Sequence, residues 1–543
     1  MAMRILVADK LAAEGLDFLK QSGMQFDEKV GLKEDELAAA AGAYDAMVVR
    51  SGAKVTAKVL EKPGNLKVIA RAGVGVDNID LPASTAKGIL VLNTAEASTL
   101  STAEHALALM MSLARKIPQA DAHVKSKPAK WNKTYYQGTQ LAGKTLGVVG
   151  LGRIGRTVAS RAIAMEMNVL GFDPFYTQPT ALDGKVKLIR DFDEFLAQLD
   201  VITFHVPGGE GTKHLLNKER LNGKCRPNLL VINDARGEVV DEIALAEALK
   251  NKKIAGAALD VFAKEPIAPD HPLLGLENVV LTPHLGASTD EAQTAVSVEA
   301  CKSIVAYLKN GEIRGAVNAG KIKLDLPPDE APFADLARRI GALLAGLSEG
   351  GYKSITLRAS GQRAPKLMET LLRLATVELL KPHLAPPVNV INVEHLARSR
   401  GIELNQVHEQ SPPQGLVGDI VGVRAEGQNG ESHRILGTVY ADGLPRVLRI
   451  DDFAMDMVPE GHMVLIINKD QPGVIGAVGT TFGEASVNIA DMVISRHTGK
   501  DGSATALMVV KADSTPTDGL MEKLRSRPNI VRVKAVELPP RGA

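Results

Sequence analysis

Short apolar runs alternate with helix-compatible stretches along the first hundred residues. Helical stretches such as 12–21 separate the runs, and a longer one covers 101–116. Alternation of this kind predicts a parallel sheet with helices on both faces. The runs that we predict to be buried strands are Ile5–Ala8, Ala46–Val49, Val68–Ala70 and Ile89–Leu92.

The stretch Leu141–Pro174 carries the most informative pattern in the chain. An apolar run ends in the G-x-G-x-x-G sequence 150–155, a helical stretch follows to Met167, and a second apolar run ends at Asp173. Glycines in this order allow a tight turn, approach of a pyrophosphate and close packing of helix on strand. Asp173 is placed to accept a ribose 2′-hydroxyl and would repel a 2′-phosphate, so we predict NAD rather than NADP. An ordinary glycine loop, the alternative, would not require the strands, helix and acid together.

The alternation of strands and helices continues beyond Asp173 as a doubly wound sheet. The helix predicted over 289–308 has no strand after it, so we expect the chain to return there to the first domain. The further strands predicted for the sheet are Val201–Phe204, Leu229–Ile232, Ile254–Leu259 and Val279–Leu281.

The last two fifths of the chain show two other patterns. After a proline-containing linker near 325–331, helices such as 333–347 mix with strands such as Ile355–Arg358 and Val388–Val390, and no catalytic constellation is visible. The stretch 463–538 then reads β-α-β-β-α-β, which is the ferredoxin-like order.

Composition narrows the classes of partner. The 543 residues include 64 Lys and Arg against 63 Asp and Glu, a net charge of +1, which provides no footprint for nucleic acid or an anionic membrane. Cys225 and Cys301 are too few for a disulfide framework, and no apolar run is long enough to span a membrane. We therefore expect a cytoplasmic protein that acts on small molecules, although a mature organellar form would look the same.

Candidate chemistry gathers at the ends of predicted strands, where open parallel sheets bind ligands. Arg50 and Ser51 end one early strand, and the segment 71–77 ends another; solvated strand-end charges and a plain turn are the alternative interpretation. Arg236, Glu265 and His284 end three late strands. A guanidinium grips a carboxylate bidentately, and a histidine oriented by a carboxylate exchanges protons near neutral pH. The chain has 12 histidines, so His284 alone would not indicate a catalytic site. The interpretation depends on Arg236, Glu265 and His284 all lying at the ends of strands.

Four segments, 150–155, 233–237, 258–262 and 283–289, resemble in this order the NAD-dependent D-2-hydroxyacid dehydrogenase family. The resemblance implies that Arg236 binds the substrate carboxylate, that His284 is the acid/base and that Glu265 is its partner. It implies no metal ion. The implied substrate contacts are Arg50, Ser51, Arg71 and Gly73 with Arg236 and His284, and the implied NAD contacts are Val74, Gly150, Gly152, Arg153, Ile154, Gly155, Asp173, Val206, Asp234, Ala235, Asp260, Gly286 and Ala287.

The segment 71–78 and the long C-terminal extension resemble the long-form D-3-phosphoglycerate dehydrogenase branch of this family. The resemblance implies oxidation of 3-phosphoglycerate, the first step of L-serine biosynthesis, by a homodimer or homotetramer. It implies a Rossmann-like NAD-binding domain inserted in a flavodoxin-like substrate domain, followed by an α+β intervening domain and an ACT domain. The expected bounds are 1–98 with 289–320 for the substrate domain, 99–288 for the NAD-binding domain, 321–455 for the intervening domain and 456–543 for the ACT domain.

Several points depart from the pattern or stay open. Glu238 replaces a common glycine, and 206–209 is an unusual loop. In the ACT unit, Asp470 and Asn488 match serine-binding positions of some relatives, but Asn468 stands where some have histidine; an L-serine effector and an ACT pair used only for assembly are both open. Rival functions are a dehydrogenase of glyoxylate, glycerate or lactate, and an NAD(H)-sensing binding protein.

Overall fold

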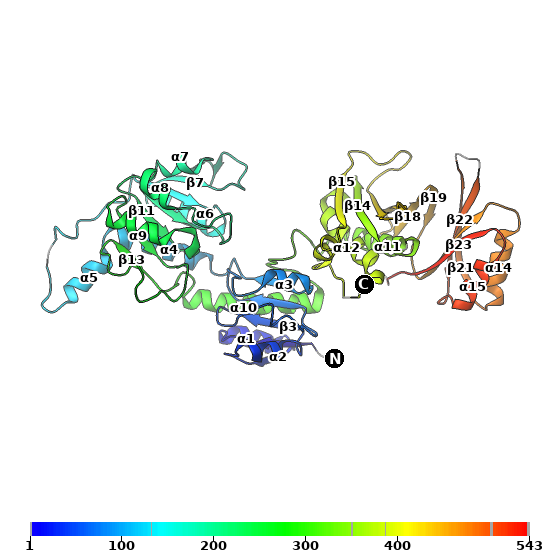
Figure 1. The fold of residues 1–543 in the computed structure, drawn as a ribbon, viewed down its shortest axis with the longest axis horizontal. Helices are drawn as coiled ribbons and strands as arrows, with labels where there is room; N and C mark the ends of the chain where they lie inside the picture. Colours follow the sequence, from blue (N-terminus) through cyan, green and yellow to red (C-terminus); the bar gives the residue numbers. More distant parts are fainter. Residues whose placement is uncertain (1–2, 132, 349–350, 386, 500–502, 540–543) are drawn as a thin grey trace.

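The structure is a computed structural model that describes residues 3–131, 133–348, 351–385, 387–499 and 503–539. Figure 1 shows four bodies of packed helices and strands along the longest axis, each built around one sheet of the described chain. The expected mixed α/β fold class is confirmed. A search of the described helices finds none with the length and apolar character that crossing a membrane requires.

The first body, blue in Figure 1, is a parallel five-stranded sheet of order β2-β1-β3-β4-β5. This order is the flavodoxin-like one. Ile5 and Val7 enter one hydrophobic core and Leu6 enters another, so both faces of the sheet are covered. Its elements are β1 (Arg4–Val7), α1 (Ala13–Gln21), β2 (Gln25–Glu28), α2 (Glu34–Ala41), β3 (Ala46–Val49), β4 (Val68–Arg71), α3 (Leu81–Ala86) and β5 (Leu90–Asn93).

A long helix from much later in the chain, α10 (Asp290–Asn310), completes this body. Thr289 caps the helix by accepting the Ala292 N–H at its hydroxyl. Apolar side chains of α10, including Ala300 and Ile304, are buried in the same core as Ile5. The chain therefore returns to the first sheet after an excursion of almost two hundred residues, as the missing strand after 289–308 predicted.

The excursion forms the second body, a sheet of order β13-β12-β11-β10-β6-β7-β9-β8 in which only the β8–β9 pair is antiparallel. Parallel pairing places the carboxyl ends of β11, β12 and β13 side by side at one edge. The strands are β6 (Thr145–Val149), β7 (Asn168–Phe172), β8 (Thr180–Ala181), β9 (Val186–Leu188), β10 (Val201–Phe204), β11 (Leu230–Asn233), β12 (Gly256–Leu259) and β13 (Val279–Leu281). The helices are α4 (Thr99–Ala114), α5 (Ile117–Lys125), α6 (Arg153–Ala164), α7 (Phe192–Leu196), α8 (Lys218–Gly223) and α9 (Glu242–Lys250).

The third body packs two helices, α11 and α12, against a mixed six-stranded sheet of order β15-β14-β16-β17-β18-β19. The helices cross closely at Gly341, where a Cβ would collide with the Ala375 carbonyl oxygen. The elements are α11 (Ala331–Leu347), β14 (Tyr352–Ser360), α12 (Met368–Leu380), α13 (Val393–Arg398), β15 (Glu403–His408), β16 (Ile420–Gly427), β17 (Ser432–Val439), β18 (Pro445–Ile450) and β19 (Phe453–Met457).

The strand predicted at Val388–Val390 is wrong, because this segment is irregular and docks the third body on the first. The Asn389 amide donates to the Gly88 carbonyl at 2.9 Å, and its Oδ1 accepts the Ile391 N–H at 2.9 Å. Ile391 is buried in the core of the first sheet. The apolar run therefore serves a contact between two bodies rather than strand pairing.

The last body is the predicted β-α-β-β-α-β unit, with an antiparallel sheet of order β21-β22-β20-β23. It joins the third body through a shared hydrophobic core, in which Met463, Leu465 and Val536 pack with side chains of α11 and β14. A charged contact adds to this, since Arg532 donates to Glu431 at 3.1 Å, and Glu431 also lies 2.9 Å from His433, which contacts Asp451 at 2.8 Å. The elements are β20 (His462–Lys469), α14 (Val474–Glu484), β21 (Ile489–Thr498), β22 (Ala504–Ala512), α15 (Asp518–Ser526) and β23 (Ile530–Glu537).

Candidate active site

The glycine turn between β6 and α6 has the shape that a dinucleotide needs. Gly150 has φ 88°, a left-handed conformation that favours glycine. A Cβ at Gly155 would collide with the Gly150 carbonyl oxygen, whereas the space beside Gly152 is open. The turn therefore leaves room for a pyrophosphate at the N-terminus of α6, where free N–H groups and the helix dipole favour an anion.

Asp173 follows β7 and is held in a fixed orientation beside this turn. Its two carboxylate oxygens accept the N–H of Leu151 and the N–H of Phe175, each at 2.9 Å. A carboxylate oxygen can accept more than one hydrogen bond, and Asp173 is only half-buried. The group can therefore accept a ribose hydroxyl as well.

His284 and Glu265, from the loops after β13 and β12, form a direct pair. His284 Nδ1 and Glu265 Oε2 are 2.8 Å apart, and the other carboxylate oxygen, Oε1, accepts the Phe262 N–H at 3.0 Å. This contact occupies Nδ1 and leaves Nε2 as the nitrogen able to exchange a proton with a substrate. The loop that carries His284 is anchored, since the His284 N–H donates to the Asp260 carbonyl at 2.8 Å.

Arg236, after β11, reaches from the second body to the first. Its Nη2 lies 3.0 Å from Asp77 Oδ2, and a Cβ on Gly75 would collide with its guanidinium group. The next residue contacts the loop of Glu265, because a Cβ on Gly237 would collide with the Phe262 backbone. The sequence-predicted trio is thus brought to one edge of the sheet, beside the segment 71–77.

Two further arginines gather around this segment. Burial, and then the cation of Arg236, lower the pKa of Arg71 to about 10, with Arg50 a smaller contributor and Asp77 opposing the shift. The Nε atoms of all three arginines are buried without a hydrogen-bond partner among the described residues. Gly73 makes room for Arg71, because a Cβ there would collide with its guanidinium group. This concentration of cations suits a ligand with more than one anionic group.

The other residues predicted to contact ligands lie in loops that follow the strands or at the start of α6. The Val74 carbonyl accepts the Asn93 amide at 2.7 Å, and the Ala287 carbonyl accepts the Gln293 amide at 2.6 Å. Arg153 Nη2 lies 2.5 Å from Glu96 Oε1, across the connection between the two bodies. Ile154, Ala235 and Gly286 are partly or fully buried, and Ser51 is exposed beside Arg50.

The two departures from the family pattern contact each other. Glu238 Oε1 accepts the Gly209 N–H at 2.6 Å, so the acid holds the unusual loop 206–209 that contains Val206. His205, which the sequence did not single out, precedes this loop, and its Nε2 lies 3.0 Å from the Thr203 hydroxyl. Burial lowers the pKa of His205 to about 4, so its imidazole is neutral near pH 7.

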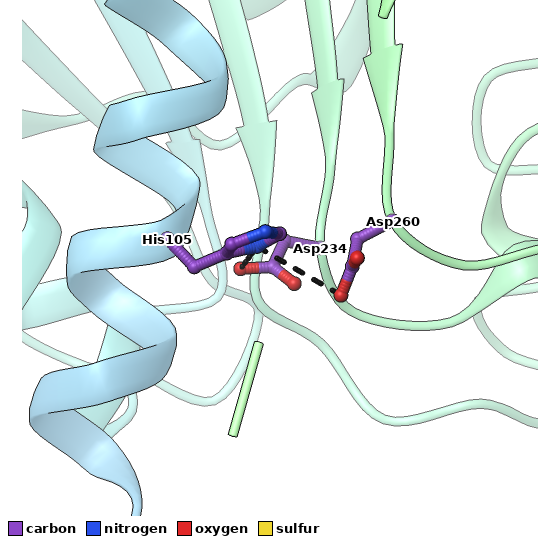
Figure 2. Close-up of side chains that lie close together, drawn as sticks. All are labelled: His105, Asp234 and Asp260. Carbon is purple, nitrogen blue, oxygen red and sulfur yellow. Dashed lines mark ion pairs between the residues drawn. The ribbon is translucent and has the colours of Figure 1, made fainter. Parts of the chain in front are cut away.

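Figure 2 shows a cluster that sequence reasoning missed, in which His105 on α4 faces Asp234 and Asp260 at the ends of β11 and β12. His105 Nδ1 is 3.5 Å from Asp234 Oδ2 and 3.8 Å from Asp260 Oδ2. Asp234 and Asp260 were predicted as cofactor contacts, but His105 lies far from them in the chain and only the folded helix brings it near. A polar residue within the buried face of a helix was the one available indication.

The two candidate effector residues do not come together within one chain. The Asp470 N–H donates to the Ala504 carbonyl at the start of β22, and the Asp470 carboxylate lies 3.5 Å from Arg496. Asn488 donates to Asp513 at 2.6 Å, just past the other end of β22. The length of that strand separates them.

Comparison with protein families assigns three segments of the chain. The NAD-binding domain of D-isomer-specific 2-hydroxyacid dehydrogenases matches residues 107–286, the D-3-phosphoglycerate dehydrogenase intervening domain matches 330–451, and the ACT domain matches 462–529. The fold and the first match define an NAD-binding protein of the D-2-hydroxyacid dehydrogenase class.

Relatives that align over almost the whole chain define the family within this class. D-3-phosphoglycerate dehydrogenase of Archaeoglobus fulgidus is 41% identical over 536 residues, 99% of this chain and 100% of the relative. The Bacillus subtilis enzyme of the same name is 38% identical over 546 residues, again 99% and 100%. The chain belongs to the D-3-phosphoglycerate dehydrogenase family.

Solved structures match a little over half of the chain. A protein of Thermus thermophilus has a TM-score of 0.53 and 34% identity, covering 58% of this chain and 100% of its own. A glyoxylate reductase from Paecilomyes thermophila has a TM-score of 0.54 and 28% identity, covering 59% and 99%.

Proposed function

We propose that this protein oxidises D-3-phosphoglycerate to 3-phosphohydroxypyruvate with NAD, the first step of L-serine biosynthesis. The observation that carries this proposal is the gathering of Arg50, Arg71 and Arg236 around the segment 71–77, together with the His284–Glu265 pair in the loops after β12 and β13, the next two strands beyond β11 in the sheet. A 2-hydroxyacid with one carboxylate needs one guanidinium group, and a phosphate on the same substrate calls for more.

The chain's own residues supply binding and proton transfer. Arg236 holds the substrate carboxylate with its planar fork, displacing the contact with Asp77, and Arg50 and Arg71 hold the phosphate. His284 accepts the hydroxyl proton at Nε2, while Glu265 at Nδ1 stabilises the imidazolium that results. NAD, when bound, would take up the hydride from the carbon that bears this hydroxyl group.

A steady-state assay of NADH formation from D-3-phosphoglycerate tests the proposal. Turnover on this substrate is expected, with much lower kcat/KM on glycerate and lactate, because neither carries a phosphate for Arg50 and Arg71. Activity on these acids or on glyoxylate, with none on D-3-phosphoglycerate, would favour the rival dehydrogenase, and cofactor binding without turnover on any acid would favour the sensing protein.

We also propose that the four bodies are four domains with the bounds 1–98 with 289–320, 99–288, 321–455 and 456–543. The support is that the first, second and fourth ranges each contain one whole sheet, and that the third contains the remaining sheet except for Asp456 and Met457 at the end of β19. A cytoplasmic location is proposed as well, because Cys225 and Cys301 are free, as thiols are in a reducing compartment.

A homodimer or homotetramer is proposed from an arm that Figure 1 shows projecting from the second body around α5. This helix buries none of its residues, and Ile117, Val124 and Trp131 are 52%, 46% and 77% exposed. Exposed apolar groups on a projecting segment are typical of subunit contacts. Light scattering of the full chain is expected to show an oligomer, and Trp131→Ser is expected to shift it toward smaller species; a monomeric wild type would contradict the proposal.

L-serine is proposed as an effector, in keeping with the ACT domain. Because Asp470 and Asn488 lie at opposite ends of β22, one serine can contact both only if two chains contribute one residue each. Calorimetry of the wild type is expected to show L-serine binding, accompanied by a lower rate of NADH formation, and Asp470→Ala is expected to weaken both effects. Absence of heat and of any change in rate would leave the ACT domain with an assembly role alone.

A further inference from the structure

The cluster of His105, Asp234 and Asp260 lies directly behind the loop that carries His284. Asp260 anchors that loop through its carboxylate, which accepts the Leu285 N–H at 2.8 Å and the Gly286 N–H at 2.9 Å. It also accepts the Thr282 hydroxyl at 2.6 Å. These three donors satisfy Asp260 as an ionised carboxylate, and they lower its pKa against the opposing effect of burial.

Asp234 differs from Asp260, because hydrogen-bond donors do not surround its carboxyl group. Its side chain is 2% exposed, and Asp234 Oδ2 and His105 Nδ1 are both buried without a hydrogen-bond partner of good geometry among the described residues. The charged groups that face Asp234 are His105 from α4 and Asp260 from β12. Burial, with the Asp260 carboxylate adding to it, raises the pKa of Asp234 to about 7 although His105 opposes the shift.

His105, the third member of the cluster, is the group that can carry a positive charge opposite the two carboxyl groups. Burial disfavours the imidazolium form of His105, but the Asp234 carboxylate 3.5 Å away, together with the charge of Asp260, outweighs burial and raises the His105 pKa. Loss of the Asp234 proton therefore makes the net charge of the cluster more negative by one unit, beside the Asp260 carboxylate.

The nicotinamide ring has to bind next to this cluster. Hydride transfer requires the ring to contact a substrate carbon held between Arg236 and His284. Asp234 precedes Arg236 by two residues, and Asp260 holds the backbone just after His284. The oxidised ring carries one positive charge and the reduced ring carries none, so a carboxylate behind the ring acts on one form only.

We propose that His105 and Asp234 are charge-setting residues that, with Asp260, tune the preference of the site for oxidised over reduced cofactor. This inference rests on the proposed function for the location of the nicotinamide. Loss of the Asp234 proton adds a negative charge behind the ring and favours NAD; return of the proton removes that preference. His105 acts through Asp234, because its cation stabilises the Asp234 carboxylate.

Dissociation constants of the full chain, measured without substrate, test the proposal. NADH binding is followed by its fluorescence and NAD by competition, at about pH 6 and about pH 8.5, on either side of the Asp234 transition. The ratio of Kd for NADH to Kd for NAD is expected to rise about fivefold between these pH values in the wild type. In Asp234→Asn, which keeps the shape and removes the titration, the ratio is expected to stay constant.

The chain offers a matched control in Asp200→Asn. Asp200 also accepts a backbone N–H, from Thr145 at 2.9 Å, but it precedes β10 at the opposite edge of the same sheet. This variant is expected to keep the pH dependence of the wild type. If Asp234→Asn does not fold, His105→Gln provides the test, because loss of the cation is expected to move the midpoint of the ratio change to higher pH.

Each other outcome would overturn the proposal. A purely structural role would weaken both cofactor forms equally in Asp234→Asn at both pH values. Stoichiometric binding of Mn²⁺ or Zn²⁺ to the wild type and not to Asp234→Asn would assign the cluster to a metal ion instead. Failure of the proposed function is distinguishable, because it would appear as missing turnover on D-3-phosphoglycerate while the two dissociation constants remain measurable.

Discussion

Replacement of His284 by alanine is expected to lower kcat on D-3-phosphoglycerate by roughly 10²-fold or more, the usual contribution of a general acid/base. Affinity for NADH is expected to change little, because the side chain is exposed and paired with Glu265 rather than buried in the cofactor crevice. Steady-state kinetics together with NADH titration give both quantities.

The control for this variant is His408→Ala. His408 is an exposed histidine at the end of β15, in a different body, and its loss is expected to leave kcat unchanged. Glu265→Gln should fall between the two, because a neutral amide still contacts Nδ1 but stabilises the imidazolium less. A His284→Ala protein as active as the wild type would remove the acid/base assignment.

Arg236→Lys is expected to raise KM for D-3-phosphoglycerate by about 10- to 100-fold, since one ammonium group cannot reproduce the two parallel hydrogen bonds of a guanidinium. The lysine keeps the positive charge, so the loss reports geometry rather than charge. The measurement is the full dependence of initial rate on substrate concentration at saturating NAD.

Arg358→Lys is the matched control, because Arg358 forms a carboxylate pair with Glu409 at 2.9 Å in the third body, away from the crevice. Its KM is expected to equal that of the wild type. An unchanged KM in Arg236→Lys would mean that the substrate carboxylate is bound elsewhere, with Arg71 the next candidate.

The parts of this protein that could be predicted from sequence depend on local patterns. The turn 150–155 was recognisable because each glycine meets a separate steric demand and the flanking strands are uninterrupted apolar runs. The edge shared by Arg236, Glu265 and His284 followed from the parallel order of their strands alone. Their catalytic roles stay predictions until the variants are measured.

The parts that were missed depend on contacts between distant segments. Val388–Val390 has the composition of a strand, but Asn389 turns the backbone and Ile391 is buried in another body. His105 joins two carboxylates only because α4 packs beside β11 and β12. Asp470 and Asn488 appear related in sequence although a full strand separates them in the fold. No local pattern encodes such distances.

Because Asn389 and Ile391 contact the first body, the four bodies are not all attached to one another in the same way. The third body is fastened both to the first and, through Arg532, to the last, whereas the chain enters and leaves the second body near 94–98 and 286–289. We therefore predict that the second body swings against a frame made by the other three bodies when the site opens and closes. A tether between Gly88 and Asn389 would leave that swing free, while a tether between Asp77 and Arg236 would lock it.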